Sequence, residues 1–271
     1  MRALLVLAAL VASAALAPSS TPAQESDEEW LQRCEDDGWD DGRRERFCEV
    51  REYGFRPGGA TIRIDAGQNG GITVRGWERD SVAVSARVQV QARTMERARE
   101  VARSITIEAD RDGIRSNAPS TGSSTGWAVS YVVYVPRRSA LRADTHNGPI
   151  GVHDVTGEMT LRAHNGPLSL RGVGGDVRAR TTNGPLTVDL DGARWSGAGL
   201  DAETQNGPVD LTIPEGYSAE LETGTINGPM RIGFPITIQG RFHKHINTKL
   251  GSGGPPVRVI TTNGPLVVRR G

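Results

Sequence analysis

The sequence predicts an all-β protein whose C-terminal half, from about Leu141 to Gly271, is a single-stranded β-solenoid (β-helix) with repeated Asn-Gly-Pro turns. Three observations predict it: the tripeptide recurs six times, apolar and polar residues alternate at the same offsets around each copy, and the composition is unusual. Glycine supplies 34 of the 271 residues, and aromatic residues only 5%. Thin stacked repeats need less apolar bulk than a conventional core, so this composition is typical of a repeat protein.

The Asn-Gly-Pro tripeptides mark the expected turn of each repeat. Their first residues are 18, 18, 23, 21 and 36 positions apart, and the last gap predicts a repeat that has lost its tripeptide, with Asn247 near the former turn. Asn tolerates left-handed backbone, Gly needs no room for a side chain, and Pro fixes φ after the bend. A copy without proline begins at Asn69 and predicts a degenerate first turn. The asparagines expected to form structural turns are Asn147, Asn165, Asn183, Asn206, Asn227 and Asn263.

The residues that flank each tripeptide alternate with a period of two. In the third repeat Val177, Ala179 and Thr181 precede the turn, and Leu186 and Val188 follow it. Two short strands per repeat would point these residues inward, with consecutive repeats stacked about 4.8 Å apart. A meander of β-hairpins also uses Asn-Gly turns, but it would not hold a repeat near 18 residues with identical inward offsets.

The N-terminus is typical of a secretory signal. Arg2, the apolar run Ala3–Ala17 and the small residues around Ala23 predict a signal peptide over residues 1–23. The apolar run is shorter than the roughly 20 residues that span a bilayer. The first cysteine, Cys34, comes too late for a lipoprotein signal. We therefore expect a periplasmic or secreted protein without a membrane anchor.

Residues 24–57 predict a small N-terminal cap that a disulfide holds together, with helical or irregular structure over residues 25–52. Cys34 and Cys48 are the two cysteines, and in an oxidising compartment such a pair most simply forms a disulfide; two free thiols are the alternative. A redox-active pair would lie closer, as Cys-x-x-Cys. Residues 25–52 carry twelve acidic and five basic side chains, whereas the rest of the chain is mildly basic. A nucleic-acid-binding protein would show a concentrated basic stripe, so we expect no nucleic-acid partner.

Residues 58–136 predict an α+β segment that precedes the repeats of residues 137–271. Its one helix is expected at 94–104, because Thr94 is a suitable N-cap and the apolar residues that follow recur at helical spacing. Strands are expected at 60–65, 71–77, 81–92 and 127–135, with a hairpin over 105–116.

The repeated Thr-x-Asn-Gly-Pro, as in Thr181-Thr182-Asn183-Gly184-Pro185-Leu186, resembles the bacterial putative adhesin family of unknown function, the DUF4097 β-strand-repeat proteins, which are relatives of bactofilin-like β-helices. The resemblance covers roughly Ala60 to Gly271. It implies a β-solenoid fold and supplies no catalytic residues.

Two pairs of histidines are candidates for metal binding. His146 and His164 occupy equivalent positions one repeat apart, and His243 and His245 would share one face of a strand. Neither pair has an evident third ligand, so exposed histidines without a metal are the simpler interpretation. We expect no metal and no cofactor.

Carboxylates on the outward positions could serve in a carbohydrate-active enzyme, since such enzymes use pairs of carboxylates. Arginines occupy the neighbouring outward positions, so a mixed solvated face explains the carboxylates equally well. The candidates are Asp189, Asp191, Asp201, Glu203 and Asp210.

Together these features predict an exported, adhesin-like β-solenoid that acts as a non-catalytic binding or adhesion module at the cell envelope. The aligned turns could form a ridge that recognises a partner, which would be an envelope component, a glycan or another copy of the chain. A self-assembling envelope scaffold is the first alternative, because the last repeat appears in the sequence without a capping element behind it. A carbohydrate-active enzyme is the second.

Overall fold

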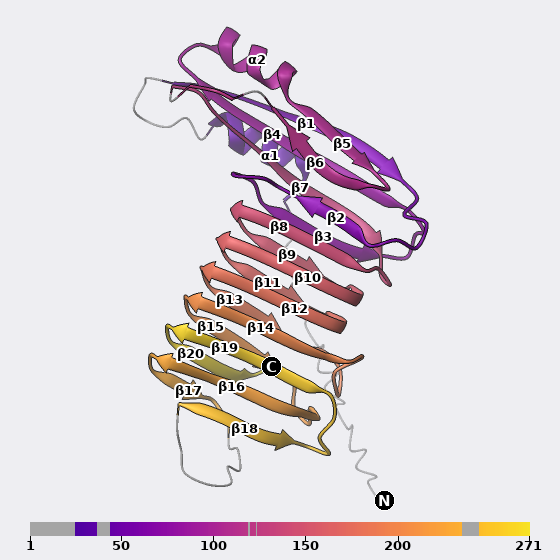
Figure 1. Ribbon diagram of the computed structural model, residues 1–271, viewed down its shortest axis with the longest axis vertical. Helices are drawn as coiled ribbons and strands as arrows, with labels where there is room; N and C mark the ends of the chain where they lie inside the picture. Colours follow the sequence, from indigo (N-terminus) through magenta and orange to yellow (C-terminus); the bar gives the residue numbers. More distant parts are fainter. Residues whose placement is uncertain (1–24, 37–43, 119, 123, 235–243) are drawn as a thin grey trace, which may run out of the picture.

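The computed structural model describes residues 25–36, 44–118, 120–122, 124–234 and 244–271. The expected signal peptide at residues 1–23 and His243 lie outside these residues. The described chain is mostly β, with two helices and two ten-stranded mixed sheets that face each other along an elongated stack (Figure 1). An all-β class is therefore confirmed.

Sheet A begins with antiparallel strands and continues with parallel ones. Its strands, in order across the sheet, are β1 (Glu45–Phe55), β4 (Val82–Ala92), β7 (Gly126–Pro136), β3 (Ile72–Trp77), β9 (Ile150–His153), β11 (Leu168–Arg171), β13 (Leu186–Asp189), β15 (Val209–Ile213), β20 (Leu266–Arg270) and β17 (Met230–Ile232).

Sheet B is parallel except for the pairs at its two ends. Its strands, in order, are β18 (His245–Leu250), β16 (Ala219–Asn227), β19 (Pro256–Asn263), β14 (Gly199–Asn206), β12 (Gly174–Asn183), β10 (Thr156–Asn165), β8 (Leu141–Asn147), β2 (Ile62–Asp65), β6 (Gly113–Asn117) and β5 (Thr106–Asp110).

Each Asn-Gly-Pro repeat contributes one strand to sheet B and one to sheet A, and the tripeptide joins them. Equivalent residues of neighbouring repeats are Cα partners, so Ala179 pairs with both Leu161 and Ala202. The inward side chains fill a single narrow core between the sheets. Met230 and Ile232 of β17 are the inward residues that stay half-exposed, because β17 is the edge of sheet A.

The spatial order of the repeats differs from their order in the chain. The strands of the sixth tripeptide, β19 and β20, lie between the strands of the fourth repeat, β14 and β15, and those of the fifth, β16 and β17. The expectation of a repeat that lost its turn near Asn247 is wrong, since Asn247 lies in β18, which pairs antiparallel with β16. The expectation of an open last repeat is wrong as well, since that repeat has a neighbour on both sides.

The turn residues serve close packing. Asp154 is the one non-glycine residue with a positive φ in the described ranges, so the turn asparagines do not use left-handed backbone. A Cβ added to any of the six turn glycines would lie 2.0–2.1 Å from the carbonyl oxygen of the neighbouring turn glycine. Glycine is required there because the backbones of adjacent repeats approach closely. These glycines are Gly148, Gly166, Gly184, Gly207, Gly228 and Gly264.

The N-terminal part continues both sheets and shares their core. Helix α2 (Met95–Ser104) begins at the N-cap Thr94 and buries Ala98, Val101 and Ala102 in the core. Arg51 of β1 donates hydrogen bonds to the carbonyls of Ala102 and Ile105 at the C-terminus of the helix, where a positive charge is favourable.

Helix α1 (Asp27–Asp36) is the only helical part of the expected cap that the described residues contain. A Cys34–Cys48 disulfide ties it to β1, which confirms that expectation. Arg87 of β4 binds Asp27 at 2.8 Å and lies over the ring of Trp30. Helical or irregular structure is expected from the sequence at residues 25–52, whereas residues 45–55 form β1, because β1 pairs with β4 along all 11 residues.

Candidate functional site

The outward face of sheet B presents side chains from six neighbouring repeats in three columns. The column nearest the turn lies beside the asparagines and is mostly uncharged, whereas the other two carry most of the charge. In spatial order, the column nearest the turn is His146, His164, Thr182, Gln205, Thr262 and Ile226; the middle column is Asp144, Arg162, Arg180, Glu203, Ile260 and Gly224; the far column is Arg142, Thr160, Arg178, Asp201, Arg258 and Glu222.

An unbroken row of amide hydrogen bonds borders this face. Each asparagine Nδ2 donates to the Oδ1 of the asparagine in the neighbouring repeat at 2.8–3.1 Å. The row follows the spatial order, so Asn263 accepts from Asn227 and donates to Asn206. Asn69, from the expected degenerate copy, accepts from Asn147 at the other end. The amides thus bind one another.

A second row of hydrogen bonds lies inside the core. The hydroxyl of a threonine two positions before the asparagine donates to the carbonyl of a turn glycine in the neighbouring repeat at 2.7–2.8 Å. The five threonines are Thr145, Thr181, Thr204, Thr225 and Thr261. The second repeat has Ala163 at this position and has no such bond. Both rows hold neighbouring repeats in register.

The basic end of the face surrounds two stacked histidines. The rings of His146 and His164 lie 4.6 Å apart and 14° from parallel. They line a shallow depression of about 390 Å³ together with Arg162, Arg180 and Asp144, and the Asp144 carboxylate binds Arg142 at 3.0 Å. Within the described residues, Arg162 has neither an ion pair nor a side-chain hydrogen bond. We call His146, His164, Arg162 and Arg180 the arginine–histidine patch. Because the Arg162 guanidinium has no ion pair, the patch is suited to bind an anion.

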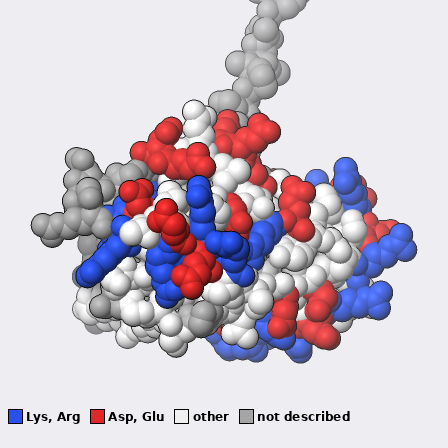
Figure 2. Space-filling view, turned by 90° about the horizontal axis from the view of Figure 1, so that it is seen from above, with Lys and Arg blue, Asp and Glu red and all other residues white. Residues whose placement is uncertain are grey.

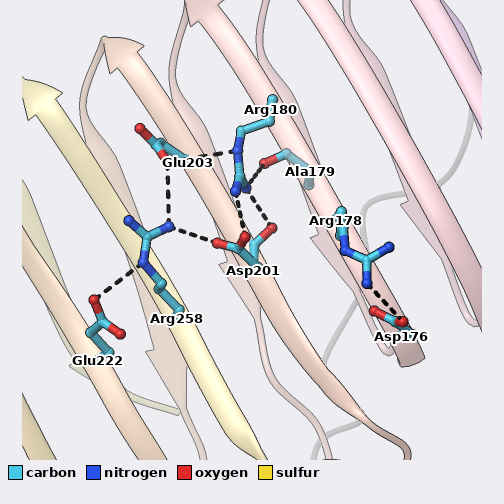
Figure 3. A network of polar contacts seen from close by, with 8 residues as sticks. All are labelled: Asp176, Arg178, Ala179, Arg180, Asp201, Glu203, Glu222 and Arg258. Atoms are coloured by element: carbon cyan, nitrogen blue, oxygen red, sulfur yellow. Dashed lines mark hydrogen bonds and ion pairs between the residues drawn. The ribbon is translucent and has the colours of Figure 1, made fainter.

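The acidic end of the face is neutralised by arginines from neighbouring strands (Figure 3). Arg180 binds the Asp201 carboxylate, and Arg258 binds it at 2.7 Å. Arg258 also contacts Glu203 at 3.3 Å and Glu222 at 3.2 Å. Burial by itself would raise the pKa of Asp201, but the hydrogen bonds and charges of the two arginines outweigh burial and lower it. Asp201 is therefore held as a carboxylate.

The other candidate carboxylates are also engaged. Asp189 binds Arg171 at 3.0 Å, and Asp210 binds Arg269 at 2.6 Å. The Asp191 carboxylate accepts from the backbone N–H of Gly192. Asp189 and Asp210 belong to sheet A, whereas Asp201 and Glu203 belong to sheet B. The five candidates thus do not converge on one site.

The described residues contain no group of three or more His, Cys, Asp or Glu side chains that could hold a metal ion. His245 lies 3.3 Å from Glu222. No helix among the described residues is long and apolar enough to cross a membrane. Seen from above the stack, positive and negative side chains are interspersed (Figure 2).

Comparison with known proteins gives structural likenesses at low identity. No family model matches the chain, and no curated protein matches it. A putative cell adhesion protein from Clostridium sporogenes is 8% identical, with a TM-score of 0.45 over 84% of this chain and 100% of that one. A putative adhesin from Bacteroides fragilis is 10% identical, with a TM-score of 0.37 over 83% and 97%. One from Parabacteroides distasonis is 10% identical, with a TM-score of 0.35 over 82% and 97%.

Sequence reasoning identified the members of the face but not their pairing. The period-two pattern places Arg162 and Arg180 outward in the same way, and it places His146 beside His164. The alternation does not reveal that the carboxylate of Asp144, the Cα partner of Arg162, binds Arg142 and leaves Arg162 without an ion pair. Arg258 was missed as a partner of Asp201, because 57 residues separate them in the chain and the repeats do not stack in chain order.

Proposed function

We propose that the chain is an exported, non-catalytic binding or adhesion module at the cell envelope, built as a single-stranded β-solenoid related to the DUF4097 β-strand-repeat proteins. Residues 1–23 act as a signal peptide, residues 24–57 as a disulfide-held N-terminal cap, residues 58–136 as an α+β segment, and residues 137–271 as the solenoid with the six Asn-Gly-Pro turns. In-register pairing of the repeats supports the solenoid. The arginines that bind the candidate carboxylates support a non-catalytic role.

The ligand that the face favours is an anionic polymer, such as a glycan that contains uronic acids. The observation that supports this ligand is the free guanidinium of Arg162. It lies beside the stacked histidines, at the depression that the patch lines. Equivalent side chains recur at the strand spacing of about 4.8 Å, which gives an extended chain successive points of contact. A carboxylate that accepts hydrogen bonds from Arg162 would gain a charge-assisted contact.

Binding of polygalacturonate by the purified chain tests this proposal, with dextran as the neutral counterpart. Saturable binding is expected to polygalacturonate alone and to weaken with added salt. Arg162→Ala should weaken it about tenfold, because a hydrogen bond to a charged group is worth about 1.5 kcal/mol or more. Arg93→Ala, the control, removes an exposed arginine next to α2 and should leave affinity unchanged. Equal loss in both variants, or equal binding of dextran, would overturn the proposal.

A further inference from the structure

The C-terminal repeat, β19 and β20 with their turn, occupies a slot between two repeats that precede it in the chain. On one side it contacts β14 and β15, and on the other β16 and β17. Gly207 donates its N–H to the carbonyl of Asn263, and Gly264 donates to that of Asn227. The slot therefore exists because the fifth repeat lies two strand spacings from the fourth, which leaves room for one repeat between them.

The pattern of apolar residues does not by itself prevent β14 from pairing directly with β16. Leu200, Ala202 and Thr204 of β14 point inward like Leu221 and Thr223 of β16. Direct pairing of β14 with β16 would thus be compatible with the core, and it is the order in which the chain presents these strands.

Charge distinguishes the two arrangements. Asp201 and Glu222 are both Cα partners of Arg258. In direct pairing of β14 with β16 the two carboxylates would become neighbours, and like charges opposite each other destabilise a sheet. The inserted repeat instead places Arg258 between them, where it binds Asp201, Glu203 and Glu222 (Figure 3). The slot is thus complementary to the C-terminal repeat.

A glycine-rich hinge connects this repeat to the rest of the chain. Residues 251–255 follow β18 and pass the start of β16, where the N–H of Ser252 donates to the Ser218 hydroxyl. Gly251, Gly253 and Gly254 have positive φ. Because β18 and β19 flank β16, the hinge spans two strand spacings, or about 9.6 Å. An inserted repeat makes the same contacts whichever copy of the chain supplies it, so exchange changes the hinge alone.

We propose that the C-terminal repeat exchanges between two copies of this chain, each inserting β19 and β20 into the slot of the other. The slot is a strand-insertion site, and its partner is the C-terminal repeat of a second copy. The exchange is concentration-dependent, because insertion within one chain competes with insertion between two. This inference does not depend on the ligand proposed above.

Cross-linking of a mixture tests it. Chains carrying Glu203→Cys alone and chains carrying Ile260→Cys alone are unfolded together in urea at pH about 5, where thiols stay protonated, then refolded and oxidised. Residues 203 and 260 are Cα partners on β14 and β19. A disulfide-linked heterodimer is expected, in larger amount at higher chain concentration. A mixture of Thr160→Cys and Arg178→Cys chains is the control, since these partners lie on consecutive repeats, and it should give no heterodimer. Equal amounts in both mixtures would overturn the proposal.

A shortened hinge gives a second readout that needs no cysteine. Deletion of residues 252–255 leaves two Cα–Cα steps between Leu250 and Pro256, which reach about 7.6 Å. That is less than the two strand spacings, about 9.6 Å, that separate β18 from β19. Insertion within one chain is then excluded, and a folded dimer is expected by sedimentation. Replacement of residues 252–255 by four serines keeps the length and should leave the monomer. A folded monomer of the deleted chain with its C-terminal repeat in place would overturn the exchange.

Discussion

Single side chains at the turn act mainly between repeats. The asparagine amide and the turn-glycine backbone each contact the same residue type in the neighbouring repeat, and the threonine hydroxyl contacts the turn glycine there. The same residues recur because each repeat presents the same groups to its neighbour. A substitution is therefore best judged by what it does to the neighbouring repeat.

Ala163→Thr should stabilise the protein. Ala163 is 5% exposed and lies between Thr145 and Thr181. A hydroxyl there would donate to the carbonyl of Gly148, as the other threonines do to their turn glycines, and the expected gain is about 1 kcal/mol. Urea unfolding measures it. Ala179→Thr is the matched control: it adds the same atoms at a fully buried position next to the row, and it should destabilise. A loss of stability in Ala163→Thr would contradict the role given to the threonines.

Asp201 should make stability depend on pH in the acid range. Its folded-state pKa is lowered, so the unfolded state binds the proton more tightly. The stabilisation is present above the unfolded pKa of about 3.9 and is lost as the pH falls through the folded value. Asp201→Asn should thus be less stable than the wild type at pH 7, and the gap should narrow toward pH about 2.

Urea unfolding across this pH range measures the gap. Asp176→Asn is the control, since it loses the 3.1 Å ion pair with Arg178. It should lower the free energy of unfolding at pH 7 by less than Asp201→Asn does, because Asp201 has two arginine partners and Asp176 has one. A gap that stays constant with pH would contradict the account of Asp201.

At the scale of the element, the strands are short and depend on register. The strands of the repeats in sheet A have three to five residues. Such strands are not stable alone, and their inward residues are buried only when neighbouring repeats supply the other walls of the core. The turn glycines decide how closely the repeats approach.

Gly184→Ala should therefore weaken the whole stack. The added Cβ would lie 2.1 Å from the carbonyl oxygen of Gly166 and 2.5 Å from its carbonyl carbon, so the backbone must shift. A loss of about 3 kcal/mol is expected, measured by urea unfolding. Gly126→Ala is the control, since its Cβ would meet nothing within 4 Å and no positive φ is needed there; it should change stability by less than about 1 kcal/mol. Similar losses in both would show that the close approach is not the cause.

At the scale of the whole molecule, the two ends of the stack are finished differently. At the N-terminal end, β1, β4 and α2 extend the core and cover it. At the other end the antiparallel strand β18 pairs with β16 and ends sheet B (Figure 1). Because the C-terminal repeat is interior, the sequence-based hypothesis of a scaffold assembled through an open last repeat loses its basis. Exchange of that repeat offers a different route to self-association.

The sequence by itself determined the repeat, the inward residues and the turns. Period-two alternation at fixed offsets permits one set of buried side chains, and Val177, Ala179 and Leu186 are buried accordingly. The disulfide followed from the compartment and the number of cysteines. These features depend on local spacing, which a sequence records directly.

Only the tertiary structure decided which repeats are neighbours. The inward patterns of β14, β16 and β19 are interchangeable, so apolar burial cannot order them. The order depends on long-range charge, with Arg258 between Asp201 and Glu222, and on the antiparallel pairing of β18. Arg162 has no ion pair although Asp144 is its Cα partner, because the Asp144 carboxylate binds Arg142 at 3.0 Å. Both the unpaired guanidinium of Arg162 and the exchangeable repeat therefore appear only in the folded chain.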